Sequence, residues 1–181
     1  MKRIFQNVIW PAIAGNVAWA FFTVLVEANW LDHAFLARLL SLLAVATYLA
    51  TDWHATDISL EKINPQYWIA DAFLAPAIAL FAISVQSKSG WEPYAIEMTF
   101  VVAIIGHLFG SWDETERGTS SWPNRLKLVA INSIGLVLLF AGTVLPQRFQ
   151  VYSIPAAIIV VVVLYIYYLR KNRQSNLETS L

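Results

Sequence analysis

The feature that most constrains the fold of this chain is the recurrence of long apolar runs. Six runs of about 20 mostly apolar residues follow one another, and this is the length that a helix needs to cross the hydrocarbon core of a bilayer. Hydrophobic residues make up 58% of the chain and charged residues only 13%, about half the usual charged share of a soluble domain. A soluble domain of 181 residues has too small a core to bury this apolar surface. The sequence therefore predicts an all-α, polytopic membrane protein with six transmembrane helices in a compact bundle. The predicted spans are Val8–Trp30, Ala34–Thr51, Gln66–Val85, Tyr94–Trp112, Leu126–Leu145 and Val151–Leu169.

The connections between the spans predict a single transmembrane domain over residues 1–181. The connection between spans one and two, and that between spans five and six, are very short and favour antiparallel hairpins. The longer connections are Asp52–Pro65, Gln86–Pro93 and Asp113–Arg125. None of them is long enough for a folded domain, and residues 170–181 form a short polar tail.

The basic residues predict the orientation, because cytoplasmic loops carry an excess of Lys and Arg. With a cytoplasmic N-terminus, nine of the 12 basic residues fall inside and three outside. Both termini are then cytoplasmic, and we expect a plasma or inner membrane. The inner residues are Lys2, Arg3, Lys62, Arg117, Arg125, Lys127, Arg170, Lys171 and Arg173, and the outer ones are Arg38, Lys88 and Arg148.

Tryptophan gives a second sign of a bilayer, because its ring favours the depth of the lipid headgroups. Of the eight tryptophans, Trp19 lies near the middle of a predicted span. The others lie at or near span ends, and we interpret them as interfacial anchors: Trp10, Trp30, Trp53, Trp68, Trp91, Trp112 and Trp122.

Several function classes lack a signal in the sequence. The 12 basic and 12 acidic residues balance, so charge indicates no nucleic-acid partner, and the lipid bilayer is the partner we expect. The absence of cysteine excludes disulfides, thiolate metal sites and thiol catalysis. No metalloprotease, nucleophile-elbow, phosphate-loop or dinucleotide motif occurs, so no catalytic residue is assigned and no motif requires a cofactor.

Three charged residues fall at similar depth on the outer side of the predicted spans. Glu27 lies near the end of the first span, Arg38 near the start of the second and Glu97 near the start of the fourth, while His33 lies in the first hairpin. A charge at membrane depth costs about 3 kcal/mol on insertion scales, so each one needs a reason. Arg38 between two carboxylates can satisfy all three charges. The group is interpreted either as a structural ion cluster or as the outer mouth of a polar path.

A second polar layer falls in the inner half of the predicted spans. Asn16, Asp71, His107 and Asn132 come from four different spans and lie at comparable depth. Asp71 and His107 can exchange a proton or share a cation, which predicts a proton-linked site if they face each other. The alternative is that each side chain bonds a backbone carbonyl or water and holds helices together, which is the interpretation we favour for the two asparagines.

A possible metal site follows the second span. Asp52, His54 and Asp57 supply the oxygen and nitrogen ligands that a divalent cation accepts. Their spacing matches no metal motif, and acidic loop residues are commonly only solvated, so we weigh this as the weaker interpretation.

Small residues predict close helix contacts. Gly106 and Gly110 form a small-xxx-small pair in the fourth span, and such pairs let two backbones approach. The contact is either within the chain or with a second subunit, so a homo-oligomer or a membrane partner is expected.

Three functions remain open from the sequence. The first is a small transporter or channel with a polar, proton-linked site in the inner leaflet. The second is a membrane scaffold, sensor or accessory subunit that acts through helix–helix contacts. The third is an intramembrane enzyme that acts on a lipid-like substrate, although the absence of catalytic motifs leans against an enzyme.

Overall fold

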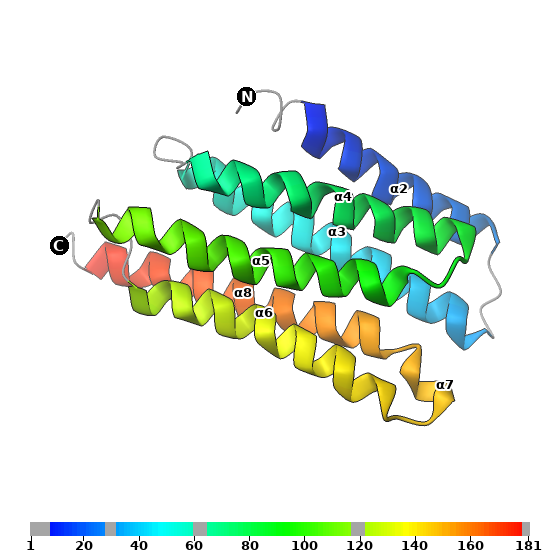
Figure 1. The fold of residues 1–181 in the computed structure, drawn as a ribbon. Coiled ribbons are helices and arrows are strands. Elements are labelled where there is room, and N and C mark those ends of the chain that lie inside the picture. The colour runs from blue at the N-terminus through cyan, green and yellow to red at the C-terminus, as the bar shows by residue number, and fades with distance from the viewer. Residues whose placement is uncertain (1–7, 28–31, 60–64, 117–121, 179–181) are drawn as a thin grey trace.

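The computed structural model describes residues 8–27, 32–59, 65–116 and 122–178. Side chains are described for these residues except 52–59, 65–72, 109–116, 122, 124, 147, 148 and 171–178. The described part of the chain is all-helical, with six long helices and one short one (Figure 1). The long helices are α2 (Trp10–Val26), α3 (His33–Ser59), α4 (Pro65–Ser87), α5 (Glu92–Glu116), α6 (Trp122–Thr143) and α8 (Ser153–Glu178), and the short one is α7 (Gln147–Gln150).

Proline residues mark where the helices begin. Proline has no backbone N–H and a fixed φ, which suits the first turn of a helix, where the N–H groups have no intrahelical acceptor. Pro11, Pro65, Pro93, Pro123 and Pro155 each lie in the first turn of a long helix, and Pro146 is the N-cap of α7. Pro76 is the exception, because it lies inside α4.

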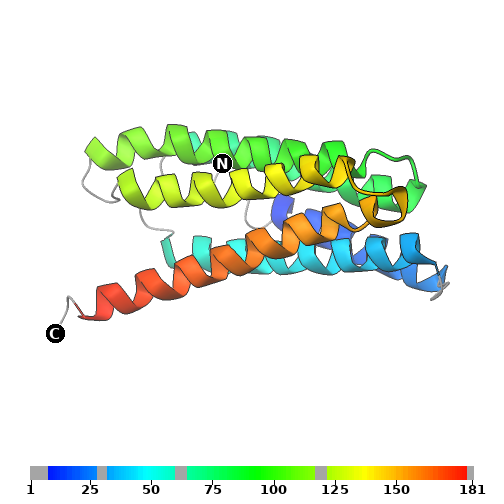
Figure 2. The same cartoon turned by 90° about the horizontal axis from the view of Figure 1, so that it is seen from below.

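The six long helices form a closed ring. Around the ring α2 packs on α4, α4 on α5, α5 on α6, α6 on α8, α8 on α3, and α3 on α2 again. Figure 2 shows the ring flattened into two layers, with α4, α5 and α6 in one layer and α2, α3 and α8 in the other. Because α8, the last helix, packs on α3 and so closes the ring, the two layers enclose a single central core.

The helices run up and down, so the bundle has two distinct ends. We call the end where α2, α4 and α6 begin and α3, α5 and α8 finish the first end. At the second end α2, α4 and α6 finish and α3, α5 and α8 begin, and α7 also lies there (Figure 1). The sequence analysis predicts that the first end is cytoplasmic.

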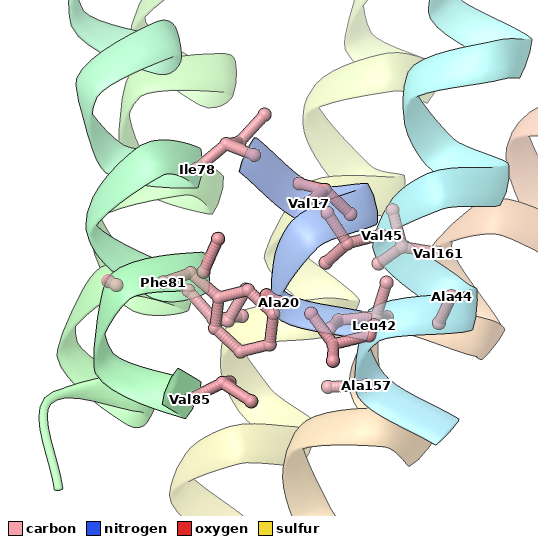
Figure 3. Close-up of a cluster of buried hydrophobic side chains, with 14 of the residues drawn as sticks. Val17, Ala20, Leu42, Ala44, Val45, Ile78, Phe81, Val85, Ala157 and Val161 are labelled. Atoms are coloured by element: carbon pink, nitrogen blue, oxygen red, sulfur yellow. The ribbon is translucent and has the colours of Figure 1, made fainter. Parts of the chain in front are cut away.

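The core between the layers is made of apolar side chains from several helices. Phe81 from α4 lies at its centre beside Leu42 from α3, and both are fully buried (Figure 3). Val17 and Ala20 from α2 close one side of the cluster, and Ala157 from α8 lies beside Leu42 (Figure 3). This packed cluster occupies the middle of the bundle and separates its two ends.

Large apolar side chains also cover the outside of the bundle. Trp19 is 66% exposed on α2, Val137 65% on α6 and Val163 59% on α8. Exposed apolar residues occur along the other three long helices too, as Leu43 on α3, Ile83 on α4 and Val101 on α5. Within the described residues, three helices are long and apolar enough to cross a membrane: His33–Thr51 in α3, Arg125–Thr143 in α6 and Ser153–Arg170 in α8. The membrane character predicted from the sequence is confirmed for these three.

Hydroxyl groups on the helices bond to their own backbone. Thr47 donates to the carbonyl of Leu43 at 2.8 Å and Thr51 to that of Thr47 at 2.7 Å, four residues earlier. Ser41 and Thr99 do the same inside the bundle. A hydroxyl that faces lipid has no water to bond, so this arrangement suits a helix in a bilayer.

Some helices continue past the predicted ends of the apolar runs. α3 extends to Ser59, so the region predicted as a connection from Asp52 is still helical there. α8 extends to Glu178 through the predicted polar tail. α6 begins at Trp122, so Arg125, which we predicted in a loop, lies inside a helix and is buried. An apolar run ends where the first charges occur, whereas a helix can continue through charged residues, so the two boundaries differ.

Candidate functional site

A cavity lies between the two layers at the second end of the bundle. Its volume is about 180 Å³. The walls are mostly apolar, and the two ionisable residues in its lining are Arg38 from α3 and Glu92 from α5. We call this the larger cavity; its other lining residues are Ala34, Ala37, Ser41, Phe81, Val85, Val151 and Ile154.

A smaller cavity of about 50 Å³ lies beside it, between α2, α3 and the end of α4. Arg38 and Val85 line both cavities, so the guanidinium group stands at their junction. The smaller cavity is also lined by Glu27, Asp32, Gln86 and Lys88. Glu27 and Arg38, which the sequence predicts in one outer layer, are therefore both found here.

The carboxylates near this junction already have compensating interactions. An oxygen of Glu27 lies 2.7 Å from the Nζ of Lys88, and both side chains are about half exposed. The backbone N–H of Ala34 donates to Asp32 at 2.9 Å, which caps the start of α3. Glu92 lies in the first turn of α5, where the helix dipole favours a negative charge.

Arg38 differs from these carboxylates. Within the part of the chain that the structure describes, no hydrogen bond or ion pair engages its guanidinium group. Its side chain is partly buried. Deeper in the larger cavity Ser41 donates its hydroxyl proton to the carbonyl of Ala37 at 2.7 Å, so its oxygen retains accepting capacity. The larger cavity thus combines apolar walls with one uncommitted cation.

Glu97, the third member of the predicted outer layer, lines neither of these cavities. It is partly buried on α5, on the helix that contributes Glu92 to the larger cavity. The sequence analysis did not single out Glu92, because it lies before the apolar run begins. The adjacent Pro93 was the available signal, since a proline after an acidic residue is typical of a helix start.

His33, also noted in the first hairpin, has a partner on another helix. Its Nδ1 lies 2.7 Å from the hydroxyl of Tyr152, and the two rings meet edge to face with centroids 6.0 Å apart. This contact joins the start of α3 to the start of α8 next to the larger cavity.

The first end has a different polar arrangement. His107 on α5 lies within electrostatic range of Arg125 on α6, and Arg125 is only 3% exposed. Asn132 is also buried on α6, two turns further along the helix. Its Nδ2 donates to the carbonyl of Leu128 at 2.9 Å, while its Oδ1 has no hydrogen-bond partner among the described residues.

The other two members of the predicted inner layer lie on different helices. Asp71 in α4 and His107 in α5 lie nearly the same number of residues from the connection between these two helices. Because the two helices pack antiparallel, Asp71 and His107 lie at similar depth. The side chain of Asp71 lies outside the described residues. Asn16 on α2 accepts a 3.4 Å hydrogen bond from the Nε2 of Gln86 on α4, which links it to the second end.

No group of three His, Asp or Glu residues that could hold a metal ion occurs among the described side chains. Asp52, His54 and Asp57, the predicted ligands, have side chains outside that set. The prediction of a metal site stays untested.

The packed core separates the polar residues of the two ends. Along α3 and α4 the cavity residues Ser41 and Phe81 are followed toward the first end by Val45 and Ile78, which are buried in the core. His107 and Asn132 lie beyond this level. No family model, curated protein or solved structure matches this chain. The functional argument therefore rests on this geometry.

Proposed function

We propose that the chain is a small multi-pass transporter of a plasma or inner membrane, with six spans and both termini on the cytoplasmic side. The larger cavity is the entrance for a solute from the outer side. The inner layer, with Asp71 and His107, is a proton-linked site that opens toward the cytoplasm. The packed core is the proposed barrier between them.

One observation carries this proposal: a cavity at one end and polar side chains near the other are divided by a packed core. A carrier needs a site that faces one side at a time, with a barrier in between. Polar groups within membrane-spanning helices are costly, and those that persist commonly mark a solute or proton path. Phe81 belongs to both the cavity wall and the core, so the proposed barrier directly borders the cavity.

The first test measures proton movement in reconstituted liposomes that contain the pH dye pyranine. A potential set by potassium and valinomycin drives the flux, and the expected result is acidification well above that of protein-free liposomes. Asp71→Asn should reduce the flux to the protein-free rate, while its elution profile in detergent stays that of the unmodified protein. Wild-type flux equal to that of empty liposomes would reject a proton-linked site.

The second test probes access from the two sides of the membrane. Because the chain has no cysteine, each introduced thiol is unique. A membrane-impermeant maleimide should label Ala37→Cys from the outer side and His107→Cys from the cytoplasmic side. Val45→Cys lies in the packed core, where Val45 is 3% exposed, and serves as the unlabelled control. Labelling of both cavity and inner-layer positions from the same side would contradict the proposed orientation of the path.

A second candidate function is that of an accessory subunit that binds another membrane helix through α2. A Cβ placed on Gly15 would meet no atom within 4 Å, and Trp19 and Phe22 are exposed on the same helix. A neighbouring helix could approach closely here, in this chain's second copy or in a membrane partner. Gly15→Leu should then abolish the dimer, or the copurifying membrane partner, that light scattering detects in mild detergent. A monomer without a copurifying partner in the unmodified protein would remove this candidate.

A further inference from the structure

We infer that the larger cavity binds a small monocarboxylate with an apolar body, held by the guanidinium group of Arg38. This inference rests on the proposed transport function and names the class of solute. It depends on three features of the cavity: the uncommitted charge, the volume and the apolar walls.

Charge selects an anion over a cation. Glu27 is paired with Lys88, and Asp32 caps α3, so neither is available to a bound cation. Glu92 lies in the first turn of α5, where the partial positive charge of the helix start offsets it. Arg38 has no such compensation among the described residues. A partly buried guanidinium without a partner is the group whose free energy a ligand carboxylate lowers most.

The planar fork of arginine adds a geometric preference. Two parallel N–H donors match the two oxygens of a carboxylate, whereas a lysine ammonium offers only a point charge. Ser41 lies at the deep side of the cavity, with its proton already donated to Ala37, so its oxygen suits no second anion. The cavity therefore accepts one carboxylate at Arg38 and not a dicarboxylate.

Volume and lining define the rest of the ligand. A cavity of about 150 Å³ holds a benzene molecule in a protein core, and the larger cavity measures about 180 Å³. Phe81, Val85 and Ile154 supply apolar walls around this space. A benzoate ion or a four-carbon aliphatic acid fits these limits, while a fatty acid chain exceeds them.

Binding is tested on the intact protein in detergent by equilibrium dialysis with radiolabelled benzoate at neutral pH. We expect saturable binding that butyrate displaces. Benzyl alcohol and benzylamine, which keep the ring but lack the carboxylate, should compete about 10- to 100-fold less well, as the loss of a charge-assisted bond implies. Equal competition by benzylamine would overturn the assignment to Arg38, and tighter binding of octanoate than benzoate would overturn the size limit.

Substitutions distinguish the contribution of the Arg38 charge from that of the cavity volume. Arg38→Gln should weaken benzoate binding about 10- to 100-fold, and Arg38→Lys should recover only part of it. Ala34→Leu keeps the charge and fills the cavity, so it should also remove binding. Arg170→Gln is the matched control, because this exposed cation near the first end lines neither cavity, and it should leave the affinity within about twofold. Unchanged benzoate affinity in an Arg38→Gln variant that folds normally would overturn the inference.

The transport function and the choice of solute fail in different ways. Saturable benzoate binding that depends on Arg38, without uptake of benzoate into liposomes, would support the cavity assignment and reject transport. Proton flux that depends on Asp71, without benzoate or butyrate binding, would support transport and reject the monocarboxylate.

Discussion

The two ends of the bundle hold their polar residues in opposite ways. At the second end, Glu27 and Lys88 are about half exposed and paired, and they stand beside cavities of about 50 and 180 Å³. Toward the first end, Arg125 and Asn132 are buried on α6. At the second end the polar groups border cavities and solvent, whereas toward the first end they are packed between helices.

This difference predicts unequal tolerance to substitution. A polar group packed between helices cannot recruit water when its hydrogen-bond partner is lost. Replacing the partner therefore costs the full desolvation penalty of the group that remains. A half-exposed pair exchanges its partner for solvent at little cost. We call the region where α6 packs against α5 and α8 the α6 seam, and we expect it to be the sensitive part of the molecule.

The largest expected effect is at Asn132 in the α6 seam. Asn132→Asp replaces the Nδ2 donor, now 2.9 Å from the carbonyl of Leu128, with a carboxyl group that is either charged without a partner or must take up a proton. The free energy of unfolding should fall by about 2–4 kcal/mol. Titration of the detergent-solubilised protein with sodium dodecyl sulfate, followed by tryptophan fluorescence, measures it.

Asn132→Leu is the control for that substitution. It removes the donor together with the Oδ1 atom, which is buried without a partner among the described residues. Its stability should stay within about 1 kcal/mol of the unmodified protein. If the two variants were equally unstable, side-chain shape rather than polarity would decide stability in the α6 seam.

The second prediction concerns close packing in the same seam. A Cβ on Gly135 would lie 2.7 Å from the Cγ2 of Val161 on α8 and 2.8 Å from the ring of Phe100 on α5. Gly135→Ala should therefore lower the free energy of unfolding by about 1–3 kcal/mol, measured by the same titration. Gly15→Ala is the matched control: a Cβ there meets nothing within 4 Å, and alanine should be neutral or slightly stabilising. An equal loss of stability in Gly15→Ala and Gly135→Ala would contradict the expectation that the α6 seam is the sensitive part of the molecule.

These glycines show what the sequence could and could not predict about packing. The sequence analysis chose Gly106 and Gly110 because their spacing is typical of a helix contact. The spacing of Gly135 and Gly142 is different, yet a Cβ on Gly142 would overlap the Cβ of Ser153 on α8. Spacing identifies the face of one helix, whereas contact depends on which helix packs there. That pairing follows from the ring order of the bundle, which no single segment encodes.

The elements themselves were easier to predict than the site. Each of the six predicted apolar runs coincides with a long helix, because a helix satisfies the backbone hydrogen bonds of an apolar segment within the segment itself. Glu27 and Arg38, which the sequence analysis placed in one outer layer, line the same small cavity, whereas Glu92, which lines the larger one, was not named. Depth along a helix can be counted from the sequence, but rotation about its axis cannot. Glu92 and Glu97 are close in depth and differ in the direction they face.

A third, smaller effect is expected where α4 turns into α5 at the second end. The Oγ of Ser84 accepts the backbone N–H of Trp91 at 2.9 Å and lies 2.8 Å from the Oγ of Ser89. Ser84 is 1% exposed, so Ser84→Ala leaves the N–H of Trp91 without its acceptor. The free energy of unfolding should fall by about 1–2 kcal/mol. Ser87→Ala is the control, since that exposed hydroxyl bonds only to carbonyls of its own helix. A loss in Ser84→Ala no larger than in Ser87→Ala would show that the turn does not depend on this hydroxyl.

The smallest expected effect is at the ion pair between Glu27 and Lys88. Both side chains are about half exposed, so water and salt screen their attraction, and Lys88→Gln should lower stability by less than about 1 kcal/mol. The loss should shrink further in 1 M salt, where the screening length falls to about 3 Å. Melting of the purified protein in detergent at low and high salt measures both quantities. A salt-independent loss above 2 kcal/mol would mean that lipid or detergent shields the pair. The second end would then resemble the first, because its charges too would be held without access to water.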